Sequence, residues 1–401
     1  MSREYACEKP SSNESRGASR ENPDRPLRFC FSKLASRNST LGDSRLKRRF
    51  YGANIRESTM TINRQIILSE YPKGMPQAEH LPMCEGEMPS AKDGQVLIKT
   101  IYLSLDPYMR GRMSPAKSYA ASVELGDVMQ GATVGQVVES RLEGYEAGDY
   151  VLGFGGWQQY SVQGKEMLRK LDPKQAPIST AVGVLGMPGF TAYAGLLEIG
   201  QPKEGETVVV SAASGAVGQV VGQIAKLKGC RVVGVAGAPD KCQHVIDTYG
   251  FDACVNYKDD DFEAQLKAAC PDGIDIYFEN VGGKVFDAVM KLVNDFARIP
   301  LCGRIAHYND TEAPQGPDQL PAFLTKLLVK RVLIKGFIQF DYAHLMKDFV
   351  RDMGSWMQAG KIQYQEDVVE GLENTVDAFQ GLLQGRNRGK LLVRVSEDTS
   401  R

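Results

Sequence analysis

A short glycine-containing turn is the segment of this chain whose residue types and spacing point most directly to chemistry. Between an apolar stretch, TVVVSAA, and a stretch of helical periodicity lie Ala213, Ser214, Gly215, Ala216, Val217 and Gly218. In a GxGxxG pattern of this kind, the middle glycine lets backbone N–H groups approach a pyrophosphate and the last lets the helix pack closely on the sheet. Ala213 stands at the first glycine position. The helix would add oriented N–H groups and positive potential. The turn predicts a dinucleotide site, with a plain helix–strand turn as the alternative.

The end of the second strand after this turn indicates which dinucleotide binds. Enzymes that use NAD place a carboxylate there, about 20 residues further on, to bind the ribose 2′-hydroxyl. Here the strand ends around Gly237 without an acid, and Lys241 follows. A cation in place of the acid favours NADPH, because it can pair with the 2′-phosphate. Tyr257 and Lys258 would offer the same phosphate a hydroxyl and a second positive charge. Asp240 is a counter-signal, and a merely solvated Lys241 is the alternative.

The chain from about residue 186 alternates strands and helices, as a dinucleotide turn requires. After a turn and helix at 186–200, six strands are expected at 207–213, 231–237, 251–257, 274–280, 298–303 and 332–338. Five helices are expected between them, at 215–228, 239–249, 259–270, 284–293 and 321–330. This alternation predicts an α/β fold with a doubly wound parallel sheet, which binds ligands at the carboxyl ends of its strands. A helix at about 344–359 and a strand at 390–395 complete the pattern.

Residues 60–186 have a different texture and are predicted to be rich in β-structure. Segments 94–106, 131–140 and 149–162 are short apolar stretches bounded by Gly, Pro and Asp, which is typical of a barrel or sandwich. We expect the strand at 390–395 to return to this part. The predicted domains are therefore a catalytic domain in two parts, 60–186 and 360–401, with a dinucleotide domain, 187–359, inserted between them.

The first 59 residues differ from the rest in charge. They hold ten Arg and three Lys against seven Asp or Glu, a net charge of +6, together with ten Ser. Such a segment is predicted to be a disordered extension. The seven acids argue against a transit peptide, and no apolar stretch of a signal peptide precedes Met60. We expect the folded protein to begin at Met60, with residues 1–59 as an over-long gene start or a tail.

Composition excludes several classes of protein. A net charge of −1 does not suggest a nucleic-acid reader, and no apolar run approaches the 18 residues of a membrane span. The eight cysteines contain no CxxC spacing, which argues against a zinc ribbon or a redox dithiol. Without an export signal, we expect free thiols in a reducing cytoplasm. No metal is predicted, because no metal-ligand spacing joins the four histidines, His80, His244, His307 and His344, to one another or to a cysteine. Without a GxSxG motif, the chemistry is expected to belong to a nicotinamide.

A set of motifs spread over residues 60–397 resembles the zinc-free medium-chain reductases of the leukotriene dehydrogenase/prostaglandin reductase type. The motifs are YLSLDPYMRGRM (102–113), VLGMPGFTAY (184–193), AASGAVG (212–218), IYFENVGG (276–283), CGRIAHYN (302–309), KGFIQF (335–340) and GRNRGK (385–390). The resemblance implies a GroES-like, β-rich catalytic domain plus a Rossmann domain, usually in a homodimer. It also implies NADPH-dependent reduction of the C=C bond of α,β-unsaturated ketones and aldehydes, curcumin-like enones included. Residues 1–59 have no counterpart in the family.

The same resemblance implies site residues. Cofactor contacts would fall on the 213–218 turn and, beyond it, on Gly237, Lys241, Tyr257, Asn280, Cys302, Tyr308, Phe337 and Asn387. The nicotinamide pocket would be lined by Met187, Pro188 and Thr191.

Two tyrosines are the predicted catalytic residues. Hydride addition to the β-carbon of an enone builds negative charge on the carbonyl oxygen, and the Tyr308 phenol would donate a hydrogen bond to it. Water is an alternative proton source, and packing against the cofactor is the alternative role for Tyr308. Tyr108 resembles a tyrosine of the family that contacts substrate, with a loop anchor as the alternative. Arg110 is expected to be structural, tying its loop to backbone carbonyls.

Two other functions and one assembly state follow from the same residues. A quinone reductase on this scaffold is the nearest alternative function, and a non-catalytic NADPH-binding protein is the other. The strand at 332–338, VLIKGFI, is expected at an edge of the parallel sheet, with little charge to protect it. An exposed apolar edge invites pairing with another chain, which predicts a homodimer.

Overall fold

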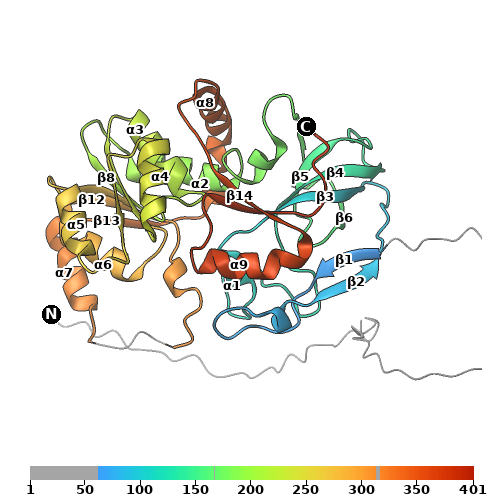
Figure 1. Ribbon diagram of the computed structural model, residues 1–401, viewed down its shortest axis with the longest axis horizontal. Helices are drawn as coiled ribbons and strands as arrows, with labels where there is room; N and C mark the ends of the chain where they lie inside the picture. The colour runs from blue at the N-terminus through green and yellow to red at the C-terminus, as the bar shows by residue number, and fades with distance from the viewer. Residues whose placement is uncertain (1–61, 167, 313–316) are drawn as a thin grey trace, which may run out of the picture. The chain divides into compact units, whose positions relative to one another are not determined.

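Three sheets organise the part of the chain that the computed structural model describes, residues 62–166, 168–312 and 317–401 (Figure 1). The extension predicted for residues 1–59 lies outside the described residues. One small sheet pairs β1 (Ile62–Ile66) with β2 (Met83–Glu87) in antiparallel fashion. In the described part of the chain, no helix is long and apolar enough to cross a bilayer.

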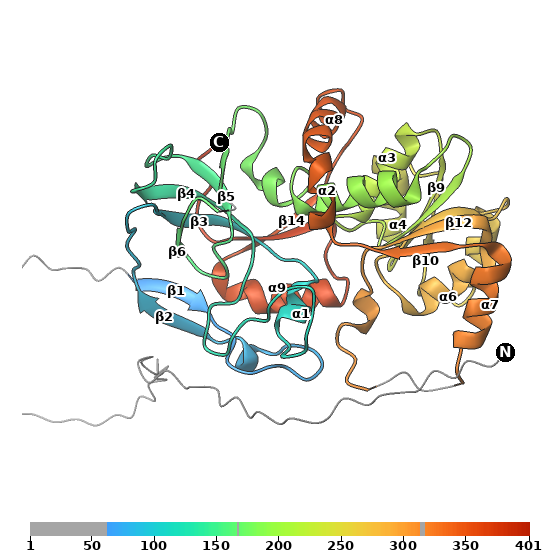
Figure 2. The same ribbon diagram turned by 180° about the vertical axis from the view of Figure 1, so that it is seen from behind.

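The six-stranded sheet, whose neighbouring strands all pair in parallel, confirms the predicted doubly wound sheet (Figures 1 and 2). In spatial order its strands are β10 (Ala253–Asn256), β9 (Arg231–Ala236), β8 (Thr207–Ser211), β11 (Ile274–Phe278), β12 (Val293–Leu301) and β13 (Leu333–Gly336). The chain moves outward from β8 to β10 and then restarts at β11, so the order reverses between β8 and β11. Such a reversal is where open α/β sheets bind ligands.

Five helices connect these strands. They are α3 (Gly218–Leu227), α4 (Pro239–Tyr249), α5 (Phe262–Ala269), α6 (Gly283–Leu292) and α7 (Leu320–Lys330). Several predicted boundaries were wrong, and α5, for example, begins at Phe262 rather than at 259. Helix α3 begins at Gly218 rather than at 215, because residues 215–217 still belong to the turn. Strand β12 begins at Val293 rather than 298, and its register with β11 shifts within the added residues.

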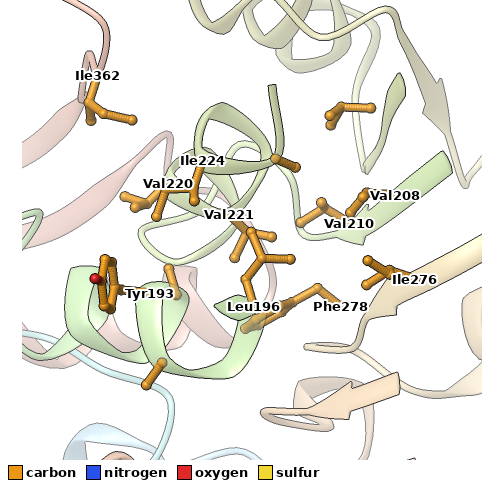
Figure 3. Close-up of a cluster of buried hydrophobic side chains, with 14 of the residues drawn as sticks. Tyr193, Leu196, Val208, Val210, Val220, Val221, Ile224, Ile276, Phe278 and Ile362 are labelled. Atoms are coloured by element: carbon orange, nitrogen blue, oxygen red, sulfur yellow. The ribbon is translucent and has the colours of Figure 1, made fainter. Parts of the chain in front are cut away.

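Burial on both faces explains the unbroken apolar sequence of β8. Val208 and Val210 point into one cluster, with side chains of α3 and of α2 (Met187–Ala194), as Figure 3 shows. Val209 points into a second cluster with side chains of α5 and α6. Full burial of one such side chain contributes roughly 1.5–3 kcal/mol. The helix predicted at 186–200 continues from α2 as π-helical turns at Gly195–Gly200, and α8 (Met346–Gln358) joins the first cluster.

The third sheet is mixed and collects strands from both ends of the described chain. Its members are β3 (Val96–Ser104), β4 (Thr133–Ser140), β5 (Tyr150–Gly153), β6 (Tyr160–Gln163), β7 (Arg169–Leu171), β14 (Glu366–Glu370) and β15 (Lys390–Arg394). Strand β15 pairs with β3, so the last strand does return to the first part of the chain, as expected. The parallel partner of β15, β14, was not predicted. Helices α1 (Met109–Arg112) and α9 (Thr375–Leu383) pack in one cluster beside this sheet.

Candidate active site

The predicted phosphate turn leaves β8 at a strained position and needs glycine where α3 begins. Ala212 has a φ of +50°, a region that residues with a side chain rarely adopt. Gly215 N–H donates to the Ala212 carbonyl at 2.9 Å, which closes the turn. A Cβ on Gly218 would lie 2.3 Å from the same carbonyl oxygen. The close approach predicted for Gly218 is therefore made to this backbone oxygen.

The turn has the donors that a dinucleotide pyrophosphate requires. Within the described residues, the N–H groups of Ser214 and Val217 have no hydrogen-bond acceptor, and the Gly215 segment forms a parallel bridge with Gly389. The methyl group of Ala216 and the hydroxymethyl group of Ser214 are small, and the first turn of α3 follows directly. Free N–H groups at a helix N-terminus bind anionic phosphate groups. The residues present fit a pyrophosphate at this place.

Four of the predicted cofactor residues meet in two contacts. The Nζ of Lys241 donates to the carbonyls of Gly385 and Asn387, at 2.6 and 2.7 Å. The ring of Tyr257 lies over Gly237, where a Cβ would be 2.9 Å from a ring carbon. Burial lowers the pKa of Lys241. The Lys241 ammonium is thus held in place at the first turn of α4 rather than free in solvent.

The counter-signal from Asp240 has a structural answer. Arg388 follows Asn387, whose carbonyl accepts a hydrogen bond from Lys241. The Arg388 guanidinium forms an ion pair with the Asp240 carboxylate. The negative charge beside the predicted 2′-phosphate position is therefore compensated. Sequence reasoning missed Arg388 as part of the site, although it stands in the motif GRNRGK, one residue after Asn387.

The carboxyl ends of β8, β11 and β12 converge on Asn280 and Cys302. The Nδ2 of Asn280 donates to the Ser211 carbonyl, and its backbone N–H donates to the Ser211 hydroxyl, both at 2.8 Å. The Cys302 N–H donates to the Glu279 carbonyl at 2.9 Å. Burial raises the pKa of the Cys302 thiol to about 12, so the thiol stays neutral. These two predicted residues therefore lie on the same sheet edge as the phosphate turn.

Glu279 is a buried carboxyl at this edge that sequence reasoning did not single out. Its side chain is 1% exposed, and its Oε1 accepts hydrogen bonds from the Gly282 N–H at 3.0 Å and the Ser211 hydroxyl at 3.1 Å. Its Oε2 has no partner among the described residues. Burial raises the pKa of Glu279, and the hydrogen bonds to Oε1 oppose that shift in part.

Tyr308 lies at the end of a short 3₁₀ turn (Ile305–His307) beyond β12. The backbone N–H of Arg304 donates to its hydroxyl at 3.5 Å, and a Cβ on Gly303 would lie 3.2 Å from that oxygen. Burial raises the pKa of the Tyr308 phenol. The phenol is consequently protonated at neutral pH and can act as a hydrogen-bond donor, which is what the predicted role requires.

Tyr108 precedes α1 and shares its surroundings with a residue that sequence reasoning missed, Tyr119. Burial, and then the nearby Asp106 carboxylate, raises the pKa of Tyr108. The Arg112 guanidinium lies 5.8 Å from the centroid of the Tyr108 ring and 4.5 Å from that of Tyr119. Tyr119 also contributes to raising the pKa of both Tyr108 and Tyr308. Tyr119 stands in an irregular loop, where no periodicity could have marked it.

The remaining predicted residues lie in α2 and beyond β13. Met187 and Pro188 begin α2, and the Thr191 hydroxyl donates to the Met187 carbonyl at 2.8 Å. Phe337 is buried in the cluster on one face of the parallel sheet, with its ring 6.2 Å from that of Phe278. Core packing accounts for Phe337, and its contact with a cofactor stays a prediction.

The histidines make local contacts. Nδ1 of His307 lies 2.8 Å from an Asp310 carboxylate oxygen, and His244 contacts the hydroxyls of Thr248 and Tyr249. Across residues 62–166, 168–312 and 317–401, no group of three or more His, Cys, Asp or Glu side chains is placed to hold a metal ion.

Comparisons with known proteins agree with this geometry. Residues 64–171 match a family model described as the N-terminal domain of oxidoreductase, and residues 216–355 match one described as zinc-binding dehydrogenase. The NADPH-dependent curcumin reductase of Escherichia coli strain K12 is 54% identical over 337 residues, which cover 84% of this chain and 98% of that protein. The 2-alkenal reductase (NADP⁺-dependent) of Nicotiana tabacum is 44% identical, over 84% of this chain and 98% of its own length.

Solved structures extend the match to three dimensions. CurA from Vibrio vulnificus in complex with NADPH superposes with a TM-score of 0.81 at 53% identity, covering 84% of this chain and all of that one. Among the relatives found by sequence, prostaglandin reductase 1 of Bos taurus is 43% identical over 80% of this chain and 95% of its own length. The resemblance seen in the motifs is thus confirmed: this chain belongs to the medium-chain dehydrogenase/reductase family, in the group of the curcumin and prostaglandin reductases.

Proposed function

We propose that this protein reduces the C=C bond of α,β-unsaturated ketones and aldehydes, curcumin-like enones included, with NADPH. The observation that carries the proposal is the half-buried Tyr308 phenol, a hydrogen-bond donor on the same sheet edge as the phosphate turn. The similar curcumin reductase, 2-alkenal reductase and (+)-pulegone reductase support the reaction class, and the NADPH complex of CurA supports the cofactor.

The residues of this chain would divide the work by position. The 213–218 turn binds the pyrophosphate, Lys241 and Tyr257 bind the 2′-phosphate, and Asn280 and Cys302 contact the nicotinamide half. Bound NADPH supplies the hydride. Tyr308 donates a hydrogen bond to the substrate oxygen as its charge develops, an interaction whose loss typically costs roughly 100- to 1000-fold in rate.

Tyr108 is proposed to contact the substrate from the side opposite Tyr308. It comes from the first predicted part of the catalytic domain, residues 60–186, whereas Tyr308 comes from the predicted cofactor domain, residues 187–359. We extend the proposed substrate contact to Tyr119, because its ring and that of Tyr108 both lie beside the Arg112 guanidinium. A planar conjugated substrate fits between such aromatic side chains.

A panel assay tests the function directly. Purified protein is supplied with NADPH and, separately, with enones, quinones and saturated carbonyls, with NADH as the comparison cofactor. We expect NADPH consumption with enones, weak use of NADH, and a product that has lost its C=C bond and kept its carbonyl. Turnover of quinones alone would favour the quinone reductase, and tight NADPH binding without turnover would favour a non-catalytic protein.

We propose a cytoplasmic homodimer. No disulfide joins the cysteines that the structure describes, which suits a reducing compartment. Strand β13 is an edge of the parallel sheet, and α7 beside it buries none of its residues fully. On α7, Leu324 and Leu328 are 53% and 78% exposed. An exposed apolar surface next to an open edge suits a second copy of the chain.

A further inference from the structure

A buried arginine joins the two segments that carry the predicted catalytic tyrosines. Arg110 lies in α1, two residues after Tyr108, and is 7% exposed. Its Nε donates a 2.9 Å hydrogen bond to Oδ1 of Asn309, the residue that follows Tyr308. The two partners are 199 positions apart in the chain. This bond therefore links the backbone segments of both tyrosines directly.

A third segment, residues 72–75, fixes the direction of the hydrogen bond from Arg110 to Asn309. Nη2 of Arg110 donates to the carbonyls of Pro72 and Gly74, at 3.0 and 2.8 Å, which confirms the expected tie to backbone carbonyls. The Nδ2 of Asn309 donates to the sulfur of Met75 at 3.6 Å, so its amide oxygen is directed at Arg110. The planar guanidinium spans two loops at once, which the single point charge of a lysine does not do.

Geometry, rather than charge, is what Arg110 contributes. Among the cations, Arg112 acts on the pKa of Tyr108 and Arg304 acts on the pKa of Tyr308. Arg110 is not among the groups that shift the pKa of either phenol. Burial lowers the pKa of Arg110, but a guanidinium starts so far above neutrality that it stays charged. Its hydrogen bonds therefore persist over the working range of pH.

The segment before Tyr108 is also held by strand β15 of the mixed sheet, through a different contact. The Nζ of Lys390, in β15, lies 2.8 Å from Oδ1 of Asp106 and 2.7 Å from the Leu105 carbonyl, and both side chains of the pair are buried. That pair fixes the segment before Tyr108 but makes no contact with the 308–309 segment. The bond from Arg110 supplies that connection.

We propose that Arg110 and Asn309 are positioning residues that set the spacing of the Tyr108 and Tyr308 hydroxyls around the substrate carbonyl. The proposal rests on the proposed enone reduction, because it assigns the pair a role in that reaction. Since neither side chain belongs to the predicted cofactor contacts, loss of the bond lowers kcat for enones and leaves NADPH affinity unchanged. A misplacement of about 1 Å in such a site costs up to roughly 100-fold in rate.

The test is a set of variants of the full-length protein, assayed with one enone that the wild type reduces. We expect Arg110→Lys and Asn309→Leu each to lower kcat by roughly 10- to 100-fold, with the NADPH Kd, measured by fluorescence titration, unchanged. Asn309→Asp keeps an oxygen acceptor for Arg110 and should recover most of the lost kcat. The double variant R110K/N309L should be no slower than the slower single variant, because each single change already removes the Arg110–Asn309 bond.

A matched control is Arg298→Lys, at the opposite, amino-terminal end of the parallel strands. Arg298 also forks between carbonyls, those of Gly200 and Gln201, and a side chain, Glu206. This variant should lower the thermal midpoint and keep kcat. Should Arg110→Lys fail to fold, the half-buried Asn309 series still decides the question.

Three results would overturn the positioning role: an unchanged kcat in Asn309→Leu, losses that multiply in the double variant, or an Asn309→Asp as slow as Asn309→Leu. A wild type that does not reduce enones would instead overturn the proposed function, so the two failures are distinguishable.

Discussion

At the scale of single residues, the Tyr308 phenol is the group on which the proposed reaction depends most. Tyr308→Phe removes one hydroxyl and keeps the ring, so the pocket should hold its shape. We expect kcat for an enone to fall roughly 100- to 1000-fold, because the developing enolate loses its donor. NADPH affinity, measured by fluorescence titration, should stay within a few-fold of wild type. Unchanged turnover would remove Tyr308 from the mechanism.

The buried Glu279 makes a prediction about pH. Burial raises its pKa, so the folded protein keeps the carboxyl protonated at pH values where the unfolded chain has released the proton. The unfolded state binds fewer protons there, and the folded state is therefore progressively destabilised as the pH rises from the ordinary glutamate range through the raised value. Glu279→Gln does not titrate and keeps an acceptor for Ser211 and Gly282.

The thermal midpoint of Glu279→Gln minus that of the wild type should consequently increase with pH. Scanning both proteins from about pH 4 to pH 9, in steps of about one unit, would measure the difference, since glutamate ordinarily titrates near the lower end of that range. A difference that stays constant, or shrinks as the pH rises, would show that this carboxyl is ionised in the folded protein.

Sequence reasoning located residues that stand in motifs and missed those that only the fold brings together. The place of Lys241 could be inferred from the predicted strand before it, and that of Tyr308 from the motif CGRIAHYN and the family resemblance that it carries. The contacts of Tyr119 and Arg388 could not be inferred, even though Arg388 stands in the motif GRNRGK, because each residue comes from an irregular segment and meets its partners across the fold. Arg110 was expected to bind carbonyls, which is correct, but its bond to Asn309 depends on the docking of two distant loops.

At the scale of elements, the turn between β8 and α3 has little tolerance for added atoms. Gly218→Ala places a Cβ 2.3 Å from the Ala212 carbonyl oxygen, and both are backbone-anchored, so the turn has to open. We expect a large loss of NADPH affinity, visible as an increase of roughly tenfold or more in Kd, which corresponds to about 1.4 kcal/mol.

Gly354→Ala, in α8, is the matched control for that turn. An added Cβ at Gly354 meets nothing within 4 Å, and alanine stabilises a helix interior by up to about 1 kcal/mol over glycine. The thermal midpoint should therefore rise, with NADPH affinity unchanged. Equal NADPH affinity in Gly218→Ala and the wild type would show that the turn does not hold the pyrophosphate.

The alternation of strands and helices was predictable because each β-unit buries its strands on both faces and leaves a near-continuous apolar sequence. The parallel order around β8 follows from that pattern. Strand β14 was not predictable, since Glu366–Glu370 is short, half-exposed and carries three acids among five residues. It forms because β15 offers it a parallel partner, an interaction that local sequence does not encode.

At the scale of the whole molecule, assembly is the property that the fold suggests most strongly. One side of α7 packs on the sheet through Phe323 and Leu327, while Leu324 and Leu328 on the other side remain exposed. Next to it, β13 exposes an unpaired edge, with Leu333 49% exposed. Two copies related by a two-fold axis would pair these edges and cover both apolar surfaces at once.

Analytical ultracentrifugation tests this assembly. We expect a species of about twice the 44.0 kDa chain mass for the wild type. Leu328→Glu should shift the protein toward a monomer, because a carboxylate would have to be buried at the centre of the interface. Val350→Glu, an equally drastic change at a half-exposed position of α8, should leave the dimer intact. A monomeric wild type, or dissociation by Val350→Glu but not by Leu328→Glu, would place the interface elsewhere or exclude it.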